Sequence, residues 1–219
     1  SGIVFGVNLV FFVMAMRRTS AANAVMIGAL QPVVLLGVAG PLFGEKPLKT
    51  VYFWSLIAMG GVAFFTYTSD TTGVATRQGD LLALIGMLLF SAYYVISKQT
   101  RAELDSMVYQ LGLTLAAAVT IVPFAFAFGH GISPPAGNEW WPVVLMALLP
   151  GAGHWLANYA HAYVPLVTMG LVNLLFTVIA PIYAWILVEE KLGGLQVLGI
   201  AVVMIALSQV VTKPIESSK

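Results

Sequence analysis

The sequence contains no cysteine, which excludes disulfides, thiolate zinc sites and cysteine-ligated clusters. Charge is also scarce, because only 9% of the 219 residues are Asp, Glu, Lys or Arg, against about 25% in soluble domains. The formal net charge of +1 provides no basic surface for nucleic acid. Neither GxxxxGK[ST] nor GxGxxG occurs, so nothing indicates a nucleotide-driven motor, and we expect no cofactor.

Hydrophobic residues make up 59% of the chain and gather in eight long apolar stretches. All but the first reach the roughly 17 to 25 residues that a spanning helix needs. None shows the alternation of barrel strands, and only helices and closed barrels satisfy the backbone in lipid. The sequence therefore predicts an all-α membrane protein with eight visible transmembrane helices. The stretches are Gly2–Met16, Ala24–Phe43, Val51–Tyr67, Leu81–Ser97, Met107–Gly129, Trp141–Tyr159, Leu166–Val188 and Leu195–Val211.

Basic residues in the connecting loops fall on two alternating sides. One side has Arg17, Arg18, Arg77 and Lys191. The other has Lys46, Lys49, Lys98, Arg101, Lys213 and Lys219. The positive-inside rule places the second side, and both ends of this chain, in the cytoplasm. We expect an integral protein of a bacterial inner membrane.

The chain repeats itself after 145 residues, which is the separation of Glu45 from Glu190. At this shift residues 8–67 lie over residues 153–212 without a gap, and Glu45-Lys46 falls on Glu190-Lys191. Helices and loops then coincide throughout. The alternative is that any two membrane hairpins would align this well.

Two further helices precede the second copy, so a complete unit has five, while the first copy has three. We therefore expect residues 1–69 to be the last three helices of one unit and residues 79–213 a complete five-helix unit. Residues 214–219 form a cytoplasmic tail. Shifting the start of the second unit back by the same interval predicts that two more helices precede Ser1 in a ten-helix parent. An odd number of spans makes consecutive units inverted, as in many secondary transporters.

Three segments carry a family resemblance: TSAANAVMIGALQPVVLLGVAGPLFGEKP, GDLLALIGMLLFSAYYVISK, and VPLVTMGLVNLLFTVIAPIYAWILVEEKLGGLQVLGIAVVMIAL. They resemble the EamA-type permeases of the drug/metabolite transporter superfamily, from about residue 6 to residue 212. Glu189-Glu190 stands where that family more often has Gly-Glu. The resemblance implies a ten-helix exporter or importer of amino acids, metabolites or drugs. The expected partners are the lipid bilayer, a small-molecule substrate and a possible homodimer.

No Asp, Glu, Lys or Arg lies inside the predicted spans, although ion-coupled carriers generally keep such a group there. His154 is therefore the candidate for proton coupling, because a histidine changes charge near cytoplasmic pH. Asn158 follows it at i+4, so both share a helix face that also adjoins Trp155. This face is predicted to bind substrate, and its alternative role is a polar contact between helices.

Gln31 and Asn173 lie on repeat-related helices, but the repeat pairs Gly28, not Gln31, with Asn173. Both are candidate substrate-binding residues, with interhelical hydrogen bonding as the alternative. Tyr94 is the candidate aromatic wall. Its neighbour Tyr93, about 100° away around a helix, would then meet lipid or a partner helix. Neutral amides, hydroxyls, one imidazole and aromatics suit a small neutral or zwitterionic solute.

Two other classes of protein remain open. One is a membrane-embedded metal-dependent hydrolase that uses His154, His161 and Glu190, although no HExxH motif occurs. The other is an inactive or structural membrane subunit. A secondary transporter that is not an enzyme and holds no metal is the leading interpretation.

Overall fold

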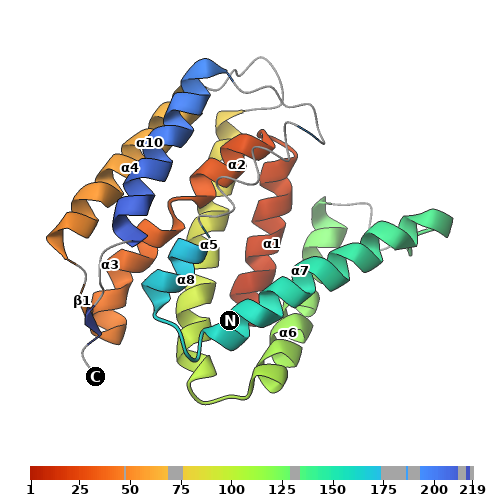
Figure 1. The fold of residues 1–219 in the computed structure, drawn as a ribbon. Helices are drawn as coiled ribbons and strands as arrows, with labels where there is room; N and C mark the ends of the chain where they lie inside the picture. The colour runs from red at the N-terminus through yellow and green to blue at the C-terminus, as the bar shows by residue number, and fades with distance from the viewer. Residues whose placement is uncertain are drawn as a thin grey trace.

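The computed structural model describes residues 1–46, 48–68, 76–128, 134–173, 186, 193–211 and 216–217, and they are predominantly helical (Figure 1). The helices are α1 (Gly2–Met16), α2 (Ala21–Gly28), α3 (Gln31–Phe43), α4 (Lys49–Thr68), α5 (Arg77–Arg101), α6 (Ser106–Phe128), α7 (Trp140–Ala160), α8 (Leu166–Val172) and α10 (Gly194–Val211). A 3-10 turn, η1 (Gly137–Glu139), precedes α7. The two-residue strands β1 (Glu45–Lys46) and β2 (Glu216–Ser217) pair antiparallel.

Three helical segments of the described chain are long and apolar enough to cross a membrane. They are Asn23–Phe43, Arg77–Arg101 and Ser106–Phe128. Shorter apolar helices occupy Gly2–Met16, Lys49–Phe65 and Gly194–Ala206. The all-α membrane fold is thus confirmed, while the count of eight spans stays a prediction. The second half of the predicted span Leu166–Val188 lies almost wholly outside the described residues.

The predicted span Ala24–Phe43 is divided between α2 and α3, and Pro32 explains the break. Proline has no N–H, so the Gly28 carbonyl cannot receive the usual helical hydrogen bond from residue 32. The backbone forms a tighter turn instead, in which the Leu30 N–H donates to the Ile27 carbonyl, three residues earlier, at 3.1 Å. The break makes Gln31 the first residue of α3. By contrast, Pro41, Pro123 and Pro150 lie inside helices that continue past them.

Side-chain oxygens mark three helix starts, since Ser20 caps α2, Thr76 caps α5 and Asp105 caps α6. Each accepts a hydrogen bond from a backbone N–H that has no partner within its helix. At the other end of α3, Gly44 has a φ of 67°, which a residue with a side chain rarely adopts.

Helix α5 lies at the centre of the bundle and contacts α1, α2, α3, α6, α7 and α8, while α4 and α10 pair at one edge (Figure 1). Small residues allow the closest approaches. A side chain at Gly2 or Gly6 would meet Ala116 or Ala117 of α6, and one at Gly61 would meet α10. Small residues thus bring α1 close to α6 and α4 close to α10, as is common between helices in membranes.

The glycines of α7 behave differently, because a side chain at Gly151 or Gly153 would meet nothing within 4 Å. These two glycines therefore make no close approach to another helix among the described residues. Helix α7 contacts α5 and α6 along only part of its length and extends away from the bundle (Figure 1).

Hydrogen bonds connect the start of α5 to the turn between α1 and α2. The Thr76 N–H and hydroxyl both donate to the Arg18 carbonyl, at 2.9 and 2.7 Å. The Asp80 carboxylate accepts hydrogen bonds from the Thr19 hydroxyl at 2.5 Å and the Asn23 amide at 3.1 Å. Gly79 lies between these contacts, where a Cβ would overlap the Arg18 carbonyl. The Gly79-Asp80 pair of the sequence pattern thus locks α5 against the first two helices.

We expect Gly79→Ala to destabilise the protein, because its methyl group would collide with backbone that cannot move aside. Overpacking of this kind typically costs about 1–3 kcal/mol. Thermal unfolding in detergent, monitored by tryptophan fluorescence, measures the change in stability. Gly112→Ala in α6 is the matched control, since nothing lies within 4 Å of its Cβ and alanine favours a helix. Equal melting temperatures for the two variants would contradict the close contact between Gly79 and the Arg18 backbone.

Candidate functional site

Tyr93 and Tyr94 project from neighbouring positions of α5 toward different partners. Both are buried, with exposed fractions of 0% and 3%. Adjacent residues of a helix point about 100° apart, so one tyrosine meets α7 and the other meets the end of α8. The predicted contact of Tyr93 with a partner helix is therefore found.

The first polar group comprises Gln31, Tyr94 and Asn173 and is called the central amide cluster. The Asn173 Nδ2 donates hydrogen bonds to the Gln31 Oε1 at 2.8 Å and to the Tyr94 hydroxyl at 2.9 Å. Three segments distant in sequence, α3, α5 and the end of α8, thus meet at one amide. Gly170 permits this convergence, because a Cβ there would press against Leu35 and Pro32 of α3.

Gln31 retains unused hydrogen-bonding capacity inside this cluster. It is only 2% exposed, and its Nε2 has no partner among the described residues. Buried polar groups in native proteins nearly always have a partner, so this N–H group indicates a place for a further molecule. Gln31 also stands at the N-terminus of α3, where the helix dipole is positive.

His161 lies beside the cluster, directly after α7. It is 1% exposed, and its ring meets the Tyr94 ring edge-on with 4.6 Å between centroids. Neither ring nitrogen has a partner among the described residues. Burial, with the positive charges of Lys98 and Arg101, lowers the pKa of His161 to about 4, so the imidazole is neutral at pH 7.

The second polar group surrounds Asn158 and is called the α7 network. The Asn158 Oδ1 accepts from the Tyr93 hydroxyl at 2.6 Å, and its Nδ2 donates to the Gln110 Oε1 at 2.8 Å. The Arg101 Nε donates to the Asn158 backbone carbonyl at 2.9 Å. Because protein groups occupy both ends of its amide, Asn158 joins α5, α6 and α7.

His154 and Trp155 occupy different surroundings. The His154 ring is half-buried among aromatic rings, with centroids 4.8 Å from Phe5, 6.1 Å from Phe90 and 6.4 Å from Tyr93. His154 and Asn158 thus both approach Tyr93, as their shared helix face predicts. Trp155 is 37% exposed and packs against Tyr159, outside both polar groups.

Sequence reasoning did not bring Gln31 and Asn173 together, and it considered His161 only as a metal ligand. One available signal was spacing, because His161 follows His154 by seven residues, or nearly two helical turns. This places both imidazoles on the side of α7 that faces α5. The described residues contain no group of three or more His, Cys, Asp or Glu that would hold a metal. Glu189 and Glu190 of the hydrolase alternative lie outside those residues.

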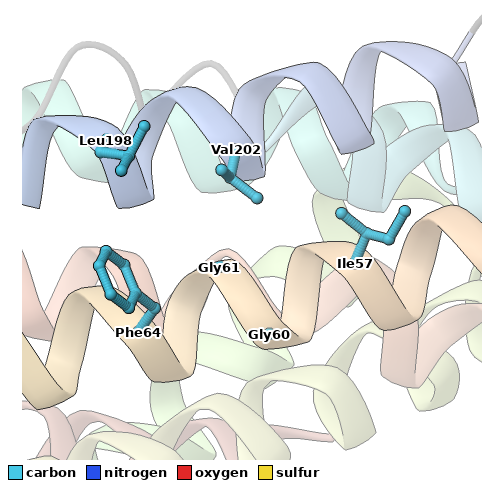
Figure 2. Close-up of a pocket in the computed structure, with 6 residues that line it drawn as sticks. All are labelled: Ile57, Gly60, Gly61, Phe64, Leu198 and Val202. Carbon is cyan, nitrogen blue, oxygen red and sulfur yellow. The ribbon is translucent and has the colours of Figure 1, made fainter.

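A separate hollow of about 330 Å³ opens between α4 and α10 (Figure 2). Its lining is entirely apolar: Ile57, Gly60, Gly61, Phe64, Leu198 and Val202. Without a polar group it cannot orient a polar solute, so it is not the candidate site.

The α7 network supplies a prediction about stability. In a double-mutant cycle, Tyr93→Phe and Asn158→Leu should show a coupling of about 0.6 kcal/mol, with about 1.7 kcal/mol as the upper end for such bonds in membranes. Unfolding in mixed micelles measures it. Tyr94→Phe with Asn158→Leu is the control cycle, since the Tyr94 hydroxyl bonds to Asn173 instead. The interpretation of this network fails if both cycles give the same coupling.

Comparison with known proteins connects this fold with transport. A family model described as the EamA-like transporter family matches residues 77–212, more than half of the chain. No curated protein matches. A solved structure titled "Crystal structure of protein" superposes with a TM-score of 0.72 at 19% identity. The superposition covers 96% of this chain and 75% of the other chain. At this identity the likeness shows that the two chains share a fold and nothing more. The chain belongs to the EamA-like transporter family.

Proposed function

We propose that the protein is a secondary transporter that moves a small neutral or zwitterionic metabolite, such as an amino acid, across the membrane. The observation that carries the proposal is the central amide cluster, where the buried Gln31 Nε2 has no partner in the part of the chain that the structure describes. Members of its family are membrane transporters. The cluster has the neutral donors and acceptors that orient a small polar solute within an apolar surround.

Alternating access between two inverted repeats is the proposed mechanism. The 145-residue shift relates α4 to α10, and these two helices contact each other. A side chain at Gly61 of α4 would meet Val203, and one at Gly199 of α10 would meet Phe65, so α4 and α10 run antiparallel. Antiparallel pairing of related helices supports units that are inverted about an axis in the membrane plane.

The break between α2 and α3 supports the same mechanism. Transporters commonly build their midplane sites from discontinuous helices, whose freed ends face the solute. Here the broken helix presents Gln31 beside Tyr94 and Asn173. On the proposed orientation, Lys98 and Arg101 mark the cytoplasmic end of α5 in a bacterial inner membrane.

Asn173→Leu should abolish solute uptake, because it removes the amide that holds Gln31 and Tyr94 in place. We expect uptake to fall at least about tenfold, the equivalent of about 1.4 kcal/mol. Counterflow of radiolabelled amino acids into proteoliposomes measures it. Gln110→Leu is the matched control, an amide removed from the α7 network, and should transport normally. Unchanged uptake by Asn173→Leu, or equal loss in both variants, would reject the central amide cluster as the solute site.

We further propose that His154 couples transport to protons. His154→Ala should abolish or reshape the pH dependence of uptake between about pH 5 and 8, where histidine changes charge. Initial rates across this range test the proposal. His130→Ala, a histidine in the Gly/Pro-rich segment before α7, should keep the wild-type profile. A wild-type profile in His154→Ala would remove the proton role from His154 while leaving transport itself in place.

A further inference from the structure

Two buried side chains next to Tyr94 have polar atoms with no partner among the described residues, the Gln31 Nε2 and both His161 ring nitrogens. The Asn173 amide donates to both the Gln31 Oε1 and the Tyr94 hydroxyl, and the His161 ring packs against the Tyr94 ring. Gln31 belongs to α3 and His161 directly follows α7, so one local distortion does not account for both. Both side chains adjoin Tyr94.

The free groups around Tyr94 are mostly donors. The Gln31 Nε2 carries two unused N–H bonds, and the neutral His161 ring has one N–H and one acceptor nitrogen. The Tyr94 oxygen accepts from Asn173, which leaves its own hydrogen available. Such a set is completed by a ligand group rich in acceptor oxygens.

The electrostatic surroundings favour a negative charge on that group. The Lys98 Nζ donates to the Val164 carbonyl at 2.9 Å, and Arg101 donates to the Asn158 and Leu104 carbonyls. The first bond holds Lys98 at the turn that follows α7, and the second holds Arg101 against the last turn of α7, so the positive charges of both act on His161. The positive N-terminal end of α3 lies at Gln31. The two cations are engaged with carbonyls, so they act through their field while the neutral donors make the contacts.

We infer that Gln31, Tyr94 and His161 receive the carboxylate of the transported solute, which makes the substrate an amino acid or another monocarboxylate. His161 thereby becomes a substrate-binding residue. The inference rests on the proposed transport function and narrows it, because a carboxylate combines two acceptor oxygens with the negative charge that the nearby cations favour. Hydrogen bonds to a charged group are the stronger kind, so the carboxylate should dominate recognition.

The test uses the full chain in proteoliposomes of phosphatidylcholine and phosphatidylglycerol. A panel of the common amino acids first identifies a solute that undergoes counterflow. Its carboxamide, which lacks the carboxylate, and its N-acetyl derivative, which keeps the carboxylate but loses the amine charge, then compete with it. We expect the carboxamide to compete at least about tenfold more weakly than the acid, and the N-acetyl derivative to keep most of the affinity.

His161→Phe locates the effect, because phenylalanine keeps an aromatic edge for Tyr94 and removes both nitrogens. The preference for acid over carboxamide should shrink to within about twofold, the discrimination expected once the contact to the charge is lost. Ser106→Ala is the matched control, since the Ser106 hydroxyl, at the start of α6, is also buried and has no partner within the described ranges. It should keep the wild-type preference. If His161→Phe does not fold, the wild-type comparison of acid and carboxamide decides alone.

Each result separates this inference from the proposed function. Counterflow in which acid and carboxamide compete equally would overturn the carboxylate site and leave transport intact. A wild-type preference that survives in a folded His161→Phe would overturn the role of His161. Failure of every amino acid in the panel to undergo counterflow or to compete would overturn both proposals.

Discussion

The need to pair polar groups away from water governs this structure. The hydrocarbon core of a membrane holds no water to hydrogen-bond with a donor or acceptor. Polar groups buried there are therefore stabilised by partners within the protein. Helix α5 meets this constraint along its length. Asp80 is paired at one end, Tyr93 and Tyr94 in the middle, and Arg101 at the other end, each with a group outside α5. These pairings help to fix the arrangement of the helices around α5, and among the described residues Gln31, Ser106 and His161 are the exceptions.

Close packing between helices, as well as hydrogen bonding, holds the bundle together. Lipid is as apolar as the helices, so helices associate in it through tight backbone contact. Gly2 and Gly6 bring α1 against α6, and Gly61 and Gly199 bring α4 against α10. The closest contact is at Gly79, where α5 meets the Arg18 carbonyl beside the Asp80 hydrogen bonds. Packing and pairing therefore coincide at the junction of α5 with the first two helices.

The sequence predicted most of the helices well and their partners poorly. The predicted stretch Gly2–Met16 coincides with α1. The predicted stretch Ala24–Phe43 was a single helix, whereas the structure divides it into α2 and α3 at Pro32. Apolar residues surround each helix, so the pattern does not determine its rotation about its own axis. Partner choice depends on that rotation, which is why the meeting of Gln31 with Asn173 emerged only from the coordinates.

The central amide cluster also bears on how the proposed transport would proceed. On the proposed repeat, Gln31 belongs to the first unit, while Tyr94 and Asn173 belong to the second. The Asn173 amide uses one hydrogen for each unit, so a rearrangement of one unit against the other changes its bond to Gln31 and can preserve its bond to Tyr94. A carboxylate that bridges Gln31 and the His161 side of Tyr94 would favour one arrangement over another by its differential contacts, which is the only way a ligand shifts such an equilibrium.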